Sequence, residues 1–300
     1  MSKHSKNDRR TEPKIRRIEV TSDRLTGRAG LALFVAYLHQ IQIFSPIERW
    51  FGALRKNRKG ICIPELFKQM LCFFVDGTSR HLTYFDQLKQ DEGYAGSIET
   101  RTGQMASSHQ IKRFFKSFSW VRVFLFRRLL QTLFLWRLQI TQPELIELGI
   151  DTMVMDNDDA LCRHGVKPTY KKKKGFQPLQ MNWGRFIVDA VFRGGDKHSN
   201  HGDTVLKMIR HMVIKIKREY RLDVPIIIRM DSGFFDQKIF ALCEALHVGY
   251  ICGGKMYKDI KQMASDWDES RWQRFESGKK DTWQYAEFGC RRGNWKQFRR

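Results

Sequence analysis

The chain has 300 residues, enough for one large domain or two ordinary domains with a hydrophobic core. A hydrophobic content of 42% and an aromatic content of 13% exclude general disorder. Its 54 Lys and Arg against 32 Asp and Glu give a net charge of +22. Because such an excess repels itself in a compact state, it predicts a polyanionic partner, with nucleic acid ahead of an anionic membrane surface.

The N-terminal part of the chain predicts a basic arm followed by a helical domain. Residues 1–28 contain nine Lys or Arg against four acids and almost no apolar periodicity, which predicts a flexible arm. Apolar residues between 31 and 41 recur at helical spacing. Residues 64–75 begin with Pro, as many helices do, and then become apolar. We therefore expect a helical, DNA-binding domain over residues 29–142.

One short helix of this domain is predicted to begin after Ser107, a residue typical of the N-cap position. Lys112 and Arg113 follow within a mixture of polar, basic and apolar positions. This mixture is typical of a recognition helix in a DNA major groove, and it is also typical of many surface helices. Lys112 and Arg113 are therefore predicted DNA contacts, with a plain surface helix as the alternative.

The sequence gives no sign of a secreted or membrane-spanning protein. Its six cysteines form no C-x-x-C pair and no zinc-like spacing, which favours free thiols in a reducing cytoplasm. The first ten residues contain no apolar core of a secretory signal. Four arginines interrupt the most apolar stretch, residues 121–138, which predicts a buried amphipathic helix and no membrane anchor. We expect a cytoplasmic protein without a membrane partner.

After Pro143 the pattern changes to short apolar runs separated by turns. Three strands followed by alternating helices and strands is the order of a ribonuclease H-like α/β fold. In that topology the first and fourth strands lie side by side and parallel. The predicted segments are strands at 148–156, 186–192, 226–230 and 248–252, a basic hairpin at 167–180, and helices at 204–220 and 235–246.

Asp231 directly follows the apolar strand Ile226–Met230 and precedes a Ser-Gly turn. In α/β sheets, ligands and chemistry lie in the crevice outside the carboxyl ends of the strands. Asp231 is therefore a candidate site residue, and the alternative is that it only caps the next helix.

A second group of acids lies in the stretch LGIDTMVMDNDD, residues 148–159. Met153, Val154 and Met155 are predicted to form a short apolar core, with Asp156 and Asp158 at its end. Crowded carboxylates repel one another, and Mg²⁺ or Mn²⁺ removes that cost. If the first and fourth strands are parallel neighbours, Asp156 or Asp158 comes close to Asp231. The alternative for this stretch is a solvated Asp/Asn turn.

Three stretches carry a strong resemblance to a known family: MDNDDA with the downstream Gly165, GFQPLQ at 175–180, and RMDSGFF at 229–235. The sequence resembles the DDE transposases of bacterial insertion sequences, transposase DDE group 1. The resemblance implies Mg²⁺- or Mn²⁺-dependent cleavage and strand transfer of double-stranded DNA at terminal inverted repeats. It also implies two metal ions, a homodimer on paired ends, and a bacterial protein bound to the nucleoid through DNA.

The resemblance assigns the second catalytic Asp to Asp231. It assigns the first to Asp156 or Asp158, which stays open, and Asp151 ranks below both. It also implies a catalytic core over residues 143–264 and the incomplete start of a β-rich insertion over residues 265–300. In such proteins the catalytic Glu lies on a helix beyond that insertion, so the resemblance implies a C-terminally truncated transposase. The alternative is a non-catalytic DNA-binding copy that competes for element ends.

Two further polar segments have less specific patterns. The run Lys171, Lys172, Lys173 and Lys174 is predicted to contact the DNA backbone, with a solvated charged turn as the alternative. The loop 194–202 contains His198 and His201, and we interpret it as a polar turn because its flanking glycines supply loop geometry and no third metal ligand is nearby.

Overall fold

The computed structural model describes residues 22, 26–55, 59–159, 165–276, 282–293 and 295–299. The chain divides into two compact units, residues 1–122 and 123–300, which are described separately. Most of the predicted basic arm lies outside the described residues. The predicted domain boundary at residue 142 stays a prediction.

The first unit is helical, and its helices bury aromatic side chains. The ring centroid of Phe67 lies 5.1 Å from that of Phe51 and 5.3 Å from that of Phe114. The predicted helices at 31–41, at 64–75 and after Ser107 are all present, the last with a capping box between Ser107 and Gln110. The helices are α1 (Gly30–Gln40), α2 (Phe44–Phe51), α3 (Ile63–Asp76), α4 (Phe85–Leu88), α5 (Glu92–Ser97) and α6 (Ser108–Lys116).

Arg28, the last residue of the predicted arm, is anchored to this helical unit. Its guanidinium donates hydrogen bonds to Asp76 Oδ1 at 2.9 Å and to Asp91 Oδ2 at 3.0 Å. It also donates to the Tyr84 hydroxyl at 2.7 Å. The chain is therefore held to the unit from residue 28 onward.

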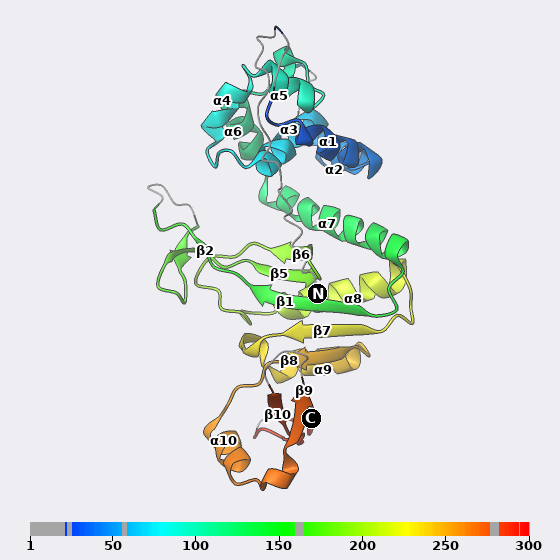
Figure 1. The fold of residues 1–300 in the computed structure, drawn as a ribbon, viewed down its shortest axis with the longest axis vertical. Coiled ribbons are helices and arrows are strands. Elements are labelled where there is room, and N and C mark those ends of the chain that lie inside the picture. The colour runs from blue at the N-terminus through cyan, green and yellow to red at the C-terminus, as the bar shows by residue number, and fades with distance from the viewer. Residues whose placement is uncertain are drawn as a thin grey trace, which may run out of the picture. The chain divides into compact units, whose positions relative to one another are not determined.

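The second unit contains a mixed five-stranded sheet in the order β6-β5-β1-β7-β8. Strands β1, β7 and β8 are parallel, and β5 is antiparallel to both β1 and β6 (Figure 1). This is the ribonuclease H-like α/β topology expected from the sequence. The elements are α7 (Trp120–Thr141), β1 (Ile146–Thr152), β5 (Leu179–Trp183), β6 (Phe186–Val191), α8 (Thr204–Glu219), β7 (Ile226–Met230), α9 (Gln237–Ala245) and β8 (Gly249–Cys252).

One face of this sheet forms the core. Alternate residues of β1 and β7 are buried because a strand directs successive side chains to opposite faces. Helices α8 and α9 pack on that face together with part of α7. The opposite face carries the exposed residues Glu147, Asp151, Arg229 and Asp231. Within the described residues no single helix is long and apolar enough to cross a membrane, and α1 with Phe44–Leu54 meets the criteria only as a pair bent by 69°.

The predicted strand at 148–156 is corrected by the structure. β1 ends at Thr152, and β2 (Met155–Asp156) belongs to a separate three-stranded sheet of order β2-β4-β3. The side chains of Met153 and Met155 are 44% and 42% exposed, so this apolar run does not form the predicted core. The remaining elements are β3 (Lys167–Pro168), β4 (Lys174–Phe176), α10 (Lys258–Ser265) and the antiparallel pair β9 (Gln273–Glu276) and β10 (Thr282–Tyr285).

An ion pair between a partly exposed arginine and a buried aspartate holds α7 against the sheet. Asp189 on β6 is fully buried, and Arg127 on α7 bonds both of its carboxylate oxygens, at 2.7 and 2.6 Å. Such a bidentate pair fixes the orientation of both groups. Breaking it from one side leaves an uncompensated charge in the core.

We expect Arg127→Met to lower the free energy of unfolding by about 3–5 kcal/mol because Asp189 stays buried without its partner. The double variant Arg127→Met with Asp189→Leu should recover most of that loss. Urea unfolding measures both effects. Arg210→Met, on the exposed side of α8, is the control. An equal loss for Arg127→Met and Arg210→Met would contradict the role of the pair.

Candidate functional site

The parallel pairing of β1 and β7 brings two carboxylates to one edge of the sheet. Ile150 pairs with Met230 in the register, so Asp151 and Asp231 follow at the same level on neighbouring strands. Ile150 and Met230 are buried, and the two aspartates are therefore directed to the exposed face. Neighbouring strands lie about 4.8 Å apart, which is within the distance at which two carboxylates can share a cation.

Each of these carboxylates is oriented by a backbone amide. The Thr152 amide donates to Asp151 Oδ1 at 2.6 Å, and the Gly233 amide donates to Asp231 Oδ1 at 2.9 Å. Asp231 thus caps the short 3-10 turn Ser232–Phe234, whereas Asp236 caps helix α9 through the Lys238 amide at 2.7 Å. The predicted capping role of Asp231 therefore applies to this turn and not to the helix.

Cys252 at the end of β8 fixes the backbone of the same turn. Burial, with the Asp231 carboxylate as a second cause, raises the pKa of Cys252 to about 11. Its thiol therefore stays protonated at neutral pH and donates to the Asp231 carbonyl at 3.3 Å. The Asp231 turn is thus held by groups from both β7 and β8.

The donor chemistry of this edge fits a hard divalent cation. Carboxylate oxygens are preferred ligands of Mg²⁺ and Mn²⁺. Within the described part of the chain, neither Asp151 nor Asp231 is paired with a cationic side chain. No set of three His, Cys, Asp or Glu side chains among the described residues gathers to hold a metal ion. The edge therefore presents two oxygen ligands.

Asp156 ends β2 of the small sheet and Asp158 lies in the turn that follows, so neither is on β1. Asp156 Oδ1 accepts from the Asp158 amide at 2.8 Å, which forms a local turn. Asp158 accepts from the Lys174 amide at 3.3 Å and lies 3.7 Å from the Lys173 ammonium. The structure thus connects these two acids to the basic hairpin. Their approach to Asp231 stays a prediction.

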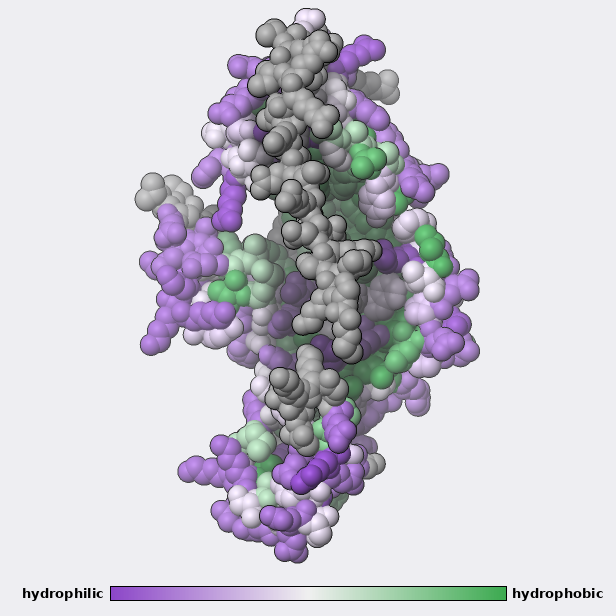
Figure 2. All heavy atoms as spheres, viewed as in Figure 1, coloured by the Kyte–Doolittle hydropathy of each residue, from purple (hydrophilic) through white to green (hydrophobic). Residues whose placement is uncertain are grey.

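The basic positions predicted to contact DNA are exposed in both units. Lys171, Lys172, Lys173 and Lys174 are all exposed where β3 turns into β4, and mostly hydrophilic residues cover this small sheet (Figure 2). On α6, Lys112 and Arg113 are exposed, whereas Ile111 and Phe114 are buried. Helix α6 therefore presents a polar, basic face away from its own core.

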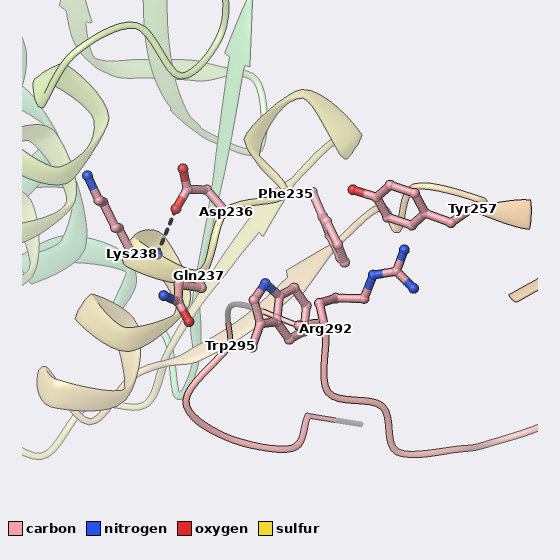
Figure 3. Close-up of a pocket in the computed structure, with 8 residues that line it drawn as sticks. Phe235, Asp236, Gln237, Lys238, Tyr257, Arg292 and Trp295 are labelled. Atoms are coloured by element: carbon pink, nitrogen blue, oxygen red, sulfur yellow. Dashed lines mark hydrogen bonds between the residues drawn. The ribbon is translucent and has the colours of Figure 1, made fainter. Parts of the chain in front are cut away.

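A pocket of about 430 Å³ lies directly after the Asp231 turn, between the start of α9 and Arg292, Gly293 and Trp295 (Figure 3). Phe235 and Trp295 form its aromatic wall, with ring centroids 5.3 Å apart. Arg292 lies over the Tyr257 ring at 3.8 Å and bonds Asp259 at 2.6 Å. The Arg292 charge is thus paired with Asp259, which does not itself line the pocket.

A comparison with family models identifies the family of this chain. The model described as Transposase DDE domain group 1 matches residues 9–300. The chain belongs to this transposase family. The resemblance noted on the sequence motifs is thereby confirmed.

Solved structures of transposases have low similarity to this family member. A piggyBac transposase synaptic complex with hairpin DNA is 14% identical with a TM-score of 0.38, over 85% of this chain and 57% of that chain. The present chain thus spans little more than half of the piggyBac chain. A Mos1 mariner paired-end complex with Mn is 10% identical with a TM-score of 0.26, over 82% of this chain and 90% of that chain. No curated protein matches the sequence.

Gly175 is essential to the small sheet because no side chain fits at its position. A Cβ atom there would lie 2.1 Å from the Met155 carbonyl oxygen. We expect Gly175→Ala to open the β2–β4 pairing and to raise amide exchange across residues 155–158 about tenfold or more, as measured by mass spectrometry. Gly103→Ala, with no atom within 4 Å of the added Cβ, is the control. Unchanged exchange in Gly175→Ala would refute this packing.

Proposed function

We propose that this transposase cleaves DNA at the terminal inverted repeats of an insertion sequence and joins the free ends to target DNA, with Mg²⁺ or Mn²⁺ bound. The observation that carries the proposal is the parallel register that sets Asp151 beside Asp231. We therefore propose Asp151 as the first acid and Asp231 as the second. Asp156 and Asp158 would instead orient the basic hairpin.

When bound, two divalent ions would supply activation of a water or a 3′-hydroxyl and stabilisation of the leaving oxygen in an in-line displacement at phosphorus. Asp151 and Asp231 would hold these ions through carboxylate oxygens. The amides of Thr152 and Gly233 each fix one of those oxygens, so the carboxylates need little reordering when an ion binds. Without such ions, the carboxylates of Asp151 and Asp231 would repel each other and a DNA phosphate.

Two carboxylates form an incomplete site for two ions. Since no three ligand side chains gather within the described residues, we propose that this 300-residue chain alone cleaves DNA slowly. DNA binding would depend on separate residues. These are Lys171–Lys174, through phosphate contacts, and Lys112 and Arg113 on α6, through the major groove. Family resemblance supports a homodimer on paired ends.

Asp151→Asn and Asp231→Asn should each lower Mn²⁺-dependent cleavage of a plasmid carrying the element ends by about 100-fold or more while leaving DNA affinity unchanged. Each change keeps the shape of the side chain and removes one anionic ligand. Gel analysis of the nicked plasmid and fluorescence anisotropy measure the two activities. Glu147→Gln is the matched control, because Glu147 lies on the same strand and face but is bonded to Arg229 at 2.8 Å.

The pattern of variants separates the competing assignments. Loss of cleavage in Asp156→Asn or Asp158→Asn, with Asp151→Asn still active, would assign the first acid to the small sheet. A wild-type chain that binds the element ends but never cleaves them with Mg²⁺ or Mn²⁺ would indicate the alternative function, a DNA-binding protein that competes for those ends.

The basic hairpin should contribute to affinity through counterion release. The slope of log K against log salt concentration is negative, and each lost phosphate contact makes it less steep by about 0.9. We expect the double variant Lys171→Gln/Lys172→Gln to reduce the steepness of this slope by up to about 1.8, equally for specific and random DNA. Lys258→Gln/Lys261→Gln on α10 removes the same charge from exposed positions outside the hairpin. Equal slopes for the two double variants would exclude a contact by the hairpin.

A further inference from the structure

We propose that Ser199 is a positioning residue that braces the carboxyl ends of β1 and β7 and so sets the separation of Asp151 and Asp231. This inference rests on the proposed function, because it gives these two carboxylates their role. Ser199 lies in the loop between β6 and α8, which the sequence indicates only as a polar turn. In the fold this loop passes beside both strand ends.

The contact with β1 runs through the residue that follows Asp151. Ser199 Oγ and Thr152 Oγ1 lie 3.3 Å apart, within hydrogen-bond distance. The Thr152 amide in turn donates to Asp151 Oδ1 at 2.6 Å. A displacement of Ser199 is therefore passed to the amide that orients Asp151.

The contact with β7 runs through the residue that orients Asp231. A Cβ atom at Gly233 would lie 2.8 Å from Ser199 Oγ, 3.1 Å from Ser199 Cβ and 3.0 Å from Asp231 Oδ1. The backbone of Gly233 has no positive φ angle, so the site requires glycine for space and not for conformation. Ser199 thus packs directly on the residue whose amide bonds Asp231.

The loop is itself held by buried groups. Arg193 is 7% exposed, and it donates to the Ser199 carbonyl at 3.4 Å and to the Gln177 carbonyl at 3.2 Å. Gln177 is 2% exposed and donates to Thr152 Oγ1 at 3.4 Å. On the other side, Asn200 donates to Asp236 Oδ2 at 2.7 Å. Ser199 is therefore a fixed point between the two strand ends and not the tip of a free loop.

This arrangement has a chemical consequence for a shared cation. Carboxylates that bind one ion must converge within a narrow range of distances, and supporting residues outside the ligand set change metal affinity about 10- to 100-fold when altered. A steric clash that moves Ser199 and the backbone of Gly233 apart by a few tenths of an ångström would increase the distance between the two carboxylates. Removing that clash would let the carboxylates move back toward each other.

The test uses compensating substitutions at the contact. Gly233→Ala adds the methyl group that Ser199 excludes, and Ser199→Gly removes the side chain that it meets. We expect Gly233→Ala to weaken Mn²⁺ binding, measured by electron paramagnetic resonance, about 10- to 100-fold. The double variant should regain only the part of that affinity lost to the clash with Ser199, because it lacks the contact between Ser199 Oγ and Thr152 Oγ1 and keeps the added Cβ 3.0 Å from Asp231 Oδ1. Gly254→Ala, whose added Cβ has no atom within 4 Å, is the matched control.

A second readout is independent of the metal. Amide exchange without Mn²⁺ should rise in residues 151–153 and 231–235 of Gly233→Ala and return toward wild type in the double variant. If amide exchange in the double variant is as fast as in Gly233→Ala, the proposed bracing role of Ser199 is wrong. Wild-type chain that binds no Mn²⁺, or binds it equally well in Asp231→Asn, would instead overturn the proposed function and with it the role of the brace. The two failures are thus distinguishable.

Discussion

The parallel register between β1 and β7 is the constraint on which the candidate site depends. It follows from hydrophobic packing, because Leu148 and Ile150 of β1 and their partners on β7 are buried under α8 and α9. A slip by one residue would turn every side chain of a strand to the other face and bury a carboxylate. The core therefore sets the position of Asp151 and Asp231.

The difference between the buried and the exposed face of the sheet also explains how this unit tolerates a buried acid. Asp189 lies on the core side of β6, where an unpaired carboxylate is costly, and Arg127 compensates it with two hydrogen bonds. Asp151 and Asp231 lie on the exposed side and have no such partner within the described residues. The paired acid in the core is thus structural, whereas two adjacent acids that no cationic side chain of the described residues pairs with form a candidate ligand site.

Hydrophobic periodicity predicted most elements, including the helices after Asp203 and Asp236 and the strand before Asp231, because their patterns are local. It misplaced the end of the first strand, since Met153 and Met155 are apolar but exposed. The alternation of Leu148 and Ile150 did contain the information that Asp151 faces outward. The position of Ser199 had no sequence signal, because it depends on how the loop folds over two strands separated by more than 70 residues.

Charge connects the site to the rest of the molecule. A net charge of +22 attracts DNA from any direction, but the two carboxylates repel a phosphate at the point where the proposed chemistry takes place. Lysine side chains could neutralise the carboxylates of Asp151 and Asp231, but the ion pairs would then occupy the carboxylate oxygens that a metal ion would need as ligands. The basic hairpin instead pairs Lys173 with Asp158, away from β1. Two divalent ions would carry twice the charge of the two carboxylates, so they would neutralise both and leave positive charge for the phosphate, whereas one lysine ammonium balances only a single carboxylate.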